Sequence, residues 1–198
     1  MNLPNKLTML RIILIPVFLV LVLVESIPLH YLWALLVYLI ACFTDTLDGH
    51  IARSRGLVTD FGKLMDPLAD KLLVMSALVA FIPVAGVPVW VVVVILGREF
   101  MVTSLRLIAA GKGVVIAADK WGKIKTISQM IWLNYTLLML WLFPEAGWAH
   151  TVFVVLMGIV VATTVLSGAN YMLKNKELYS DRLGSNCNTR SNIMQLYN

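Results

Sequence analysis

The sequence predicts an all-α integral membrane protein with six transmembrane helices. Of its residues, 60% are hydrophobic and 14% are charged, whereas a soluble domain is about 45–50% apolar and about 25% charged. Turn-forming residues divide the apolar sequence into six segments, and the basic residues gather at alternate segment ends. The length of 198 residues allows roughly one domain, which we expect to be a bundle of spanning helices.

The six apolar segments are separated by proline, glycine or charged residues. We expect helices over residues 7–24, 29–44, 72–82, from 89 to beyond 98, 124–143 and 148–173, the third stopping at a turn over 83–88. The first segment has the length of a signal-peptide core, but the residues after it form a poor cleavage site, so we expect it to be retained. Several apolar runs are shorter than the roughly 20 residues that cross a bilayer. Their helices must therefore include the polar residues at their ends.

The distribution of basic residues predicts the orientation. The connections over 25–29, 83–88 and 144–150 contain no Lys or Arg, and all 16 Lys and Arg fall at the opposite ends of the helices. The positive-inside rule places those ends and both termini in the cytoplasm. The net charge of +5 is then explained by topology and by anionic lipid head groups, and no nucleic-acid partner is expected.

We expect two parts in the chain. Residues 1–174 form the six-helix transmembrane domain, and residues 175–198 form a polar cytoplasmic tail. Terminal segments of this composition are commonly mobile, and we assign no chemistry to the tail.

Four aspartates lie between the second and third predicted helices. Asp45 and Asp48 are three residues apart, and Asp66 and Asp70 are four apart, so each pair lies on one face of a helix. Asp45 lies about 24 Å along a helix that starts near residue 29, close to the cytoplasmic boundary of the hydrocarbon core. If the two helices are neighbours, four carboxylates converge.

Clustered carboxylates at a membrane boundary repel one another and lose hydration. A divalent ion resolves both problems, because Mg²⁺ binds carboxylate and phosphate oxygens, and two ions can clamp the two oxygens of a displacement. The sequence has no His/Cys set of the kind that binds zinc. Gly49 and Ala52 permit close approach of a phosphate, and Arg53 offers a planar fork suited to a diphosphate. The alternative is a solvated loop held by salt bridges.

The same segment resembles the CDP-alcohol phosphotransferase family, whose pattern is D-x2-D-G-x2-A-R-x8-G-x3-D-x3-D. Every fixed position is filled, by Asp45, Asp48, Gly49, Ala52, Arg53, Gly62, Asp66 and Asp70. Stretches at 2–11, 97–107 and 120–126 are similar, more narrowly, to members that join CDP-diacylglycerol to glycerol 3-phosphate. Together the similarity spans roughly residues 2 to 130.

The resemblance implies the fold of that family, with six helices, a site for two Mg²⁺ or Mn²⁺ ions, and usually a homodimer. It implies that Asp45 and Asp66 bridge both ions, that Asp48 binds one, and that Asp70 binds the other and serves as the base. It also implies contacts with the CDP moiety from Gly49, Arg53, Thr59, Asn5 and Thr8. We therefore expect a multi-pass protein of a bacterial plasma membrane, with its active site facing the cytoplasm.

Later cations bear on the choice of acceptor. Arg98 lies about 14 Å along a helix that starts near residue 89, and Arg106 about 26 Å along it. An arginine at mid-depth must face a polar cavity. With Lys123 at the start of the fifth helix, these cations are suited to a dianionic phosphate, which glycerol 3-phosphate carries and serine or free inositol does not. The alternative is that Arg98 only pairs with Glu99 or a motif aspartate.

Other functions stay open at this stage. A sibling enzyme would use phosphatidylglycerol, inositol phosphate or serine as acceptor, and charge alone does not separate glycerol phosphate from inositol phosphate. A cation transporter is a further alternative, although transporters commonly show internal repeats and sites at the bilayer midplane. The aspartate motif does not recur in the second half of this sequence.

Overall fold

The computed structural model describes residues 3–54, 60–111 and 120–175; for 3–6, 45–54, 60–64 and 66–67 it describes the backbone alone. These residues form six helices and no strand: α1 Leu3–Leu23, α2 His30–Ser54, α3 Asp60–Ala85, α4 Val89–Gly111, α5 Lys120–Leu142 and α6 Gly147–Lys174. Each predicted apolar segment falls in its own helix. The all-α prediction is confirmed for the described residues.

The helices are longer than the apolar runs that predicted them. α2 continues past residue 44 to Ser54, and α3 begins at Asp60, so the polar motif residues in these stretches are helical, as their spacing predicted. The predicted turn over 83–88 is shorter than expected, because α3 continues through Pro83 to Ala85. The helix ends where Gly86 adopts a φ of 68°, a left-handed conformation that glycine accepts without strain.

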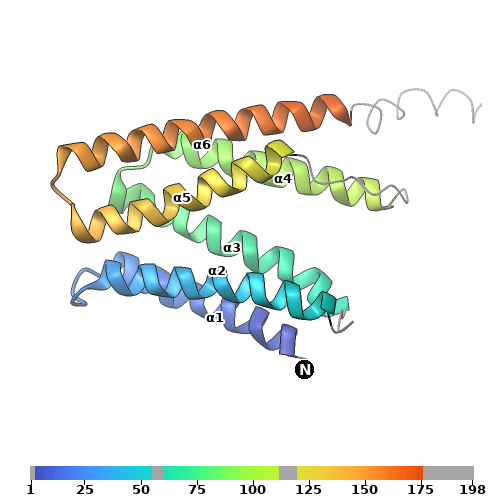
Figure 1. The fold of residues 1–198 in the computed structure, drawn as a ribbon, viewed down its shortest axis with the longest axis horizontal. Coiled ribbons are helices and arrows are strands. Elements are labelled where there is room, and N and C mark those ends of the chain that lie inside the picture. The colour runs from blue at the N-terminus through green and yellow to red at the C-terminus, as the bar shows by residue number, and fades with distance from the viewer. Residues whose placement is uncertain (1–2, 55–59, 112–119, 176–198) are drawn as a thin grey trace, which may run out of the picture.

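The chain runs back and forth between two ends of the molecule (Figure 1). The connections 24–29, 86–88 and 143–146 lie together at one end, and the start of α1 and the carboxyl ends of α2, α4 and α6 lie at the other. The last turns of α2 and the first turns of α3 meet at this second end. Among the described residues, Arg106, Lys120, Lys123 and Lys174 lie in the parts of their helices nearest this second end, as the charge pattern predicted.

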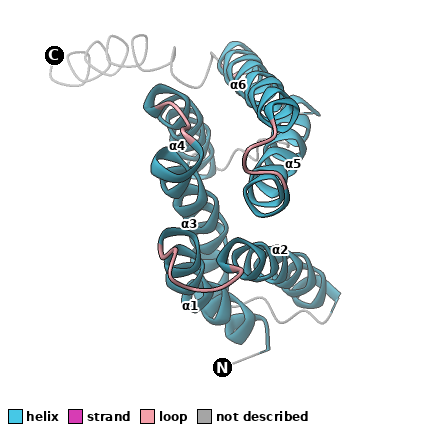
Figure 2. Ribbon diagram, turned by 90° about the vertical axis from the view of Figure 1, so that its left-hand side faces the viewer, coloured by secondary structure: helices cyan, strands magenta, loops and turns pink. Residues whose placement is uncertain are grey.

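The six helices form two groups (Figure 2). α1 packs on α2 and α3, and α6 packs on both α4 and α5. The main contact between the groups joins α2 to α5, whereas α3 touches α4 and α5 less extensively. The space where α3, α4 and α5 face one another holds the cavities described below.

Apolar side chains cover both the interior and much of the outer surface. The interior includes Phe18, Phe81 and Trp132, whereas Phe43, Leu107 and Leu173 are among many large apolar residues that are exposed. An apolar exterior of this extent is a liability in water and suits a lipid environment. The molecule is therefore built as a membrane protein.

Membrane-spanning capacity differs among the helices. By length and composition, Leu68–Ala85 and Gly147–Lys174 qualify as spans, and the apolar stretches Leu7–Leu23 and His30–Thr44 are shorter. α4 has three charged residues along its length, and α5 begins with three lysines. With 21 to 28 residues each, all six helices are about 31–42 Å long, enough for a hydrocarbon core of roughly 30 Å.

Candidate active site

The motif aspartates lie on two helices that meet at one end of the molecule. Asp45 and Asp48 belong to the last turns of α2, and Asp66 and Asp70 to the first turns of α3. Of the four carboxylates, that of Asp70 is described, and it is exposed. The side chains of the other three lie outside the described residues, as do those of Asn5 and Arg53 and the surroundings of Gly49; Thr59 lies outside them entirely. The convergence of the four carboxylates stays a prediction.

Asp70 opens onto a cavity between the two helix groups. This cavity has a volume of about 460 Å³ and is lined by Asp70 and Lys71 of α3, by Arg98, Glu99, Val102, Thr103 and Arg106 of α4, and by Gly122, Lys123, Thr126 and Ile127 of α5. The three cations predicted to bind the acceptor thus lie on one cavity with the predicted base. Four cations face two carboxylates in this lining, so the cavity favours an anion.

Arg98 is held by contacts on two sides. Its Nη1 donates to Glu99 Oε1 at 3.1 Å, and its Nη2 donates to Ser167 Oγ of α6 at 2.5 Å. Its Nε is buried and has no hydrogen-bond partner within the described part of the chain. The pairing with Glu99, considered above as an alternative, is confirmed as a contact. It does not remove Arg98 from the cavity wall.

Two further cations of the cavity, Arg106 and Lys123, are more exposed than Arg98. The guanidinium carbon of Arg106 lies 5.8 Å from the ring centroid of Tyr171 on α6, a distance at which a cation interacts with an aromatic face. Lys123 is exposed in the first turn of α5. Both lie nearer than Arg98 to the end of the molecule that holds the motif.

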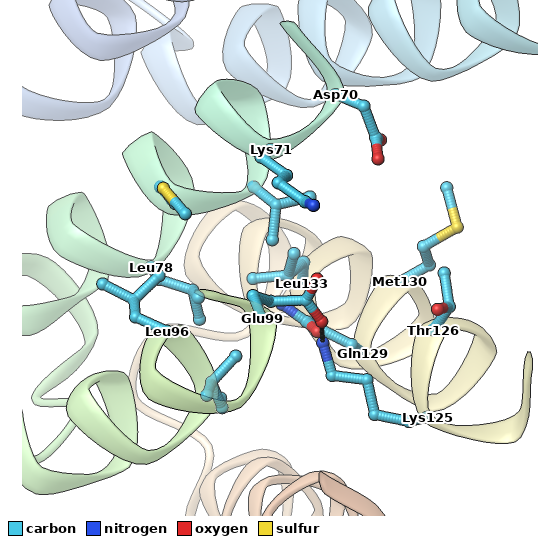
Figure 3. Close-up of a pocket in the computed structure, with 13 residues that line it drawn as sticks. Asp70, Lys71, Leu78, Leu96, Glu99, Lys125, Thr126, Gln129, Met130 and Leu133 are labelled. Carbon is cyan, nitrogen blue, oxygen red and sulfur yellow. Dashed lines mark hydrogen bonds and ion pairs between the residues drawn. The ribbon is translucent and has the colours of Figure 1, made fainter. Parts of the chain in front are cut away.

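A second, smaller cavity of about 70 Å³ adjoins the first and shares Asp70, Lys71, Glu99 and Thr126 with it. Figure 3 shows Glu99 and Lys125 meeting at its floor beside Gln129, with Asp70 on the opposite side. Lys125 is buried and donates to Glu99 Oε1. The remaining walls of this smaller cavity are mainly apolar and are formed by Val74, Met75, Leu78, Ile95, Leu96, Met130 and Leu133. The polar cavity therefore narrows into an apolar pocket.

Thr103 of the cavity wall takes part in two further hydrogen bonds. Lys71 Nζ donates to Thr103 Oγ1, and Thr103 Oγ1 donates to the Glu99 carbonyl oxygen at 2.8 Å. Because Lys71 belongs to α3 and Thr103 to α4, the first of these bonds links the two helix groups beside Asp70, whereas the second lies within α4.

Thr8, predicted to help bind the donor, is fully buried on α1 and lines neither cavity. α1 packs on α2 and α3. Thr8 therefore belongs to a helix that contacts both motif helices, and it does not line the cation cavity. Its contact with the donor stays a prediction.

Sequence reasoning missed two residues of this site, Lys125 and Ser167, and considered Glu99 only as a partner of Arg98. Lys125, which is buried, pairs with the half-buried Glu99, and Ser167 holds Arg98 from 69 positions away. A Lys in the first turns of an apolar helix was a usable signal, because a buried lysine requires a partner. No local pattern in the sequence connects Ser167 to Arg98.

The donor set suits a hard divalent cation. The motif offers carboxylate oxygens from two helices whose ends meet, and Asp70 presents its carboxylate to a cavity with room for a phosphate. Oxygen ligands of this kind fit Mg²⁺ or Mn²⁺. The residues present therefore fit the predicted metal, and the full ligand set rests on the side chains beyond the described ones.

The fold and the cavity together define a helical membrane protein with a cavity rich in cations beside an acidic motif. The chain belongs to the CDP-alcohol phosphatidyltransferase family, which it matches over residues 1–174. The resemblance inferred from the motif is therefore confirmed.

Three similar proteins come from bacteria. The chain is 44% identical over 192 residues to the CDP-diacylglycerol–glycerol-3-phosphate 3-phosphatidyltransferase of Bacillus subtilis (strain 168), covering 89% of this chain and 96% of that protein. It is 38% identical over 178 residues to a probable phosphatidylglycerophosphate synthase of Mycobacterium tuberculosis (strain ATCC 25618 / H37Rv), covering 87% and 81%. A Rickettsia typhi protein named like that of Bacillus subtilis is 41% identical over 137 residues, covering 69% and 76%.

Proposed function

We propose that this chain transfers the phosphatidyl group of CDP-diacylglycerol to glycerol 3-phosphate, releasing CMP and forming phosphatidylglycerophosphate. The observation that carries the proposal is the single cavity shared by Asp70, Arg98, Arg106 and Lys123. A phosphorylated alcohol placed there has its phosphate among cations and its hydroxyl near a carboxylate. The names of the relatives from Bacillus subtilis and Rickettsia typhi supply the identity of the alcohol.

The donor binds at the motif end. Asp45, Asp48, Asp66 and Asp70 would hold Mg²⁺ or Mn²⁺, two ions per subunit, and the ions would supply positive charge that stabilises the diphosphate and the departing CMP. Gly49, Arg53 and Thr59 contact the CDP moiety, with Asn5 and Thr8 of α1 assisting. The support is the donor chemistry of the motif and the family match that contains it.

The acceptor binds in the cation cavity. Arg98, Arg106 and Lys123 bind the phosphate of glycerol 3-phosphate, and this binding orients the free hydroxyl toward Asp70. The acceptor oxygen forms a bond to the phosphorus that carries diacylglycerol, the bond from that phosphorus to the CMP oxygen breaks, and Asp70 takes the hydroxyl proton. The attack is direct and in line, without a covalent enzyme intermediate. Retained configuration at a chiral phosphorus would contradict it.

The membrane arrangement follows from helix length and charge. All six helices cross the bilayer, and both termini and the motif end face the cytoplasm of a bacterial cell at the plasma membrane, where glycerol 3-phosphate is in solution. The charge asymmetry between the two ends of the molecule supports this orientation. The protein assembles as a homodimer, and the support for this assembly is the resemblance to the family.

An acceptor panel tests the proposal. Purified protein is given CDP-diacylglycerol, Mg²⁺ and one alcohol at a time, and CMP release is measured with glycerol 3-phosphate, inositol phosphate, serine and phosphatidylglycerol. Among these four alcohols, we expect only glycerol 3-phosphate to support turnover. Turnover with another alcohol and none with glycerol 3-phosphate would overturn the acceptor while leaving the reaction class intact. CMP release from none of them would overturn both.

A further inference from the structure

Two adjacent small residues of α6, Ser167 and Gly168, are buried against Arg98. Ser167 Oγ accepts a hydrogen bond from Arg98 Nη2 at 2.5 Å. A Cβ atom added at Gly168 would lie 3.3 Å from Arg98 Cγ, closer than ordinary contact. The aliphatic stem of Arg98 therefore runs along the α6 backbone, where glycine leaves room for it.

The guanidinium group of Arg98 is bounded from α5 and α4 as well. A Cβ atom at Gly122 of α5 would lie 3.5 Å from Arg98 Nη2 and 4.0 Å from Ser167 Oγ. Glu99 Oε1 of α4 accepts from Arg98 Nη1, and it also accepts from Lys125. An arginine with its stem and both terminal nitrogens fixed loses less entropy when it binds an anion than a mobile one does.

We propose that Ser167 and Gly168 are positioning residues that set the guanidinium of Arg98 in the wall of the acceptor cavity and thereby set affinity for the acceptor phosphate. The inference rests on the proposed function and adds α6 to the acceptor site. Neither residue lines the cavity, so both act through Arg98. Their effect falls on the acceptor, because the predicted donor contacts belong to α1 and α2 and to Thr59, which precedes α3 in the sequence.

The test compares the two substrates in variants of α6. Ser167→Ala removes a hydrogen bond to a charged group, and we expect the KM for glycerol 3-phosphate to rise about 3- to 10-fold, with kcat and the KM for CDP-diacylglycerol within about twofold of wild type. Ser167→Thr keeps the hydroxyl and restores the acceptor KM. Gly168→Ala displaces the stem of Arg98 and raises the acceptor KM in the same way.

Gly158 provides a matched control on the same helix, because a Cβ atom there would meet nothing within 4 Å. Gly158→Ala leaves both KM values unchanged. If Ser167→Ala or Gly168→Ala leaves the acceptor KM unchanged, or raises both KM values equally, the two residues only pack and the inference is wrong. Should Ser167→Ala fail to fold, Gly168→Ala decides by the same criteria.

Isothermal titration calorimetry of the detergent-solubilised protein measures its affinity for inorganic phosphate. This measurement tests the inference separately from the proposed function. We expect phosphate affinity to fall in Ser167→Ala and Gly168→Ala and to stay at the wild-type value in Gly158→Ala. This expectation does not depend on which acceptor the enzyme uses. Wild-type protein that binds phosphate but does not use glycerol 3-phosphate counts against the proposed function alone. Equal phosphate affinity in all variants, with normal wild-type turnover, counts against the inference alone.

Discussion

The acidic end of α2 and α3 and the cation cavity beside it are assembled in different ways. Each aspartate pair is set by spacing within one helix, so a short stretch of sequence encodes it. The cavity gathers Arg98, Lys123 and Asp70 from three helices, and Ser167 supports it from a fourth. In the proposed reaction the first region performs the chemistry and the second selects the acceptor. Substitutions in the two regions should therefore have different kinetic signatures.

Removal of metal should have the largest effect. With EDTA, CMP release from donor and acceptor falls to background, because the carboxylates alone do not neutralise the diphosphate. Mg²⁺ or Mn²⁺ restores it, since both prefer oxygen ligands. Turnover that persists after dialysis against EDTA would show that the acidic region works without metal. It would then contradict the proposed difference between the two regions.

Asp70→Asn should lower kcat by about 10²- to 10⁴-fold, the usual range for loss of a general base. Binding of CDP-diacylglycerol should be largely retained, which equilibrium binding of the radiolabelled lipid measures. Normal turnover in this variant would exclude Asp70 as the base. Because Asp70 lines both cavities, this variant is the sharpest probe of where the two regions join.

Lys123→Ala should act on the acceptor. Losing one cation from a phosphate site raises the KM for glycerol 3-phosphate about 10-fold, with a small change in kcat. Lys120→Ala is the matched control, because Lys120 is exposed in the same first turn of α5 and lines neither described cavity. Equal effects of the two substitutions would show that general surface charge, and not the cavity, attracts the acceptor.

Much of the helical fold could be predicted from the sequence. The apolar segments locate all six helices, and spacings of three and four correctly predict that the motif aspartates are helical. The helix ends were less predictable: α2 and α3 extend into polar sequence, and α3 runs past Pro83 to Gly86. Proline near a carboxyl end disturbs few hydrogen bonds, so the residue that ends α3 is the glycine with positive φ.

The residues of the functional site were likewise predictable from the sequence only in part. Arg98, Arg106 and Lys123 were singled out because a charge within an apolar helix requires a polar environment. That argument locates a cation at a depth but does not identify its neighbours. The pairing of Lys125 with Glu99 and the hydroxyl of Ser167 against Arg98 depend on how α4, α5 and α6 pack.

The sequence by itself determined the helical membrane class, the acidic motif and the end of the molecule where charge gathers, because helix periodicity and hydropathy act over a few neighbouring residues. Only the tertiary structure decided that Asp70 shares a cavity with Arg98, Arg106 and Lys123 and that α6 fixes the first of them. Those relations join residues up to 69 positions apart, and helix packing, rather than local spacing, brings them into contact.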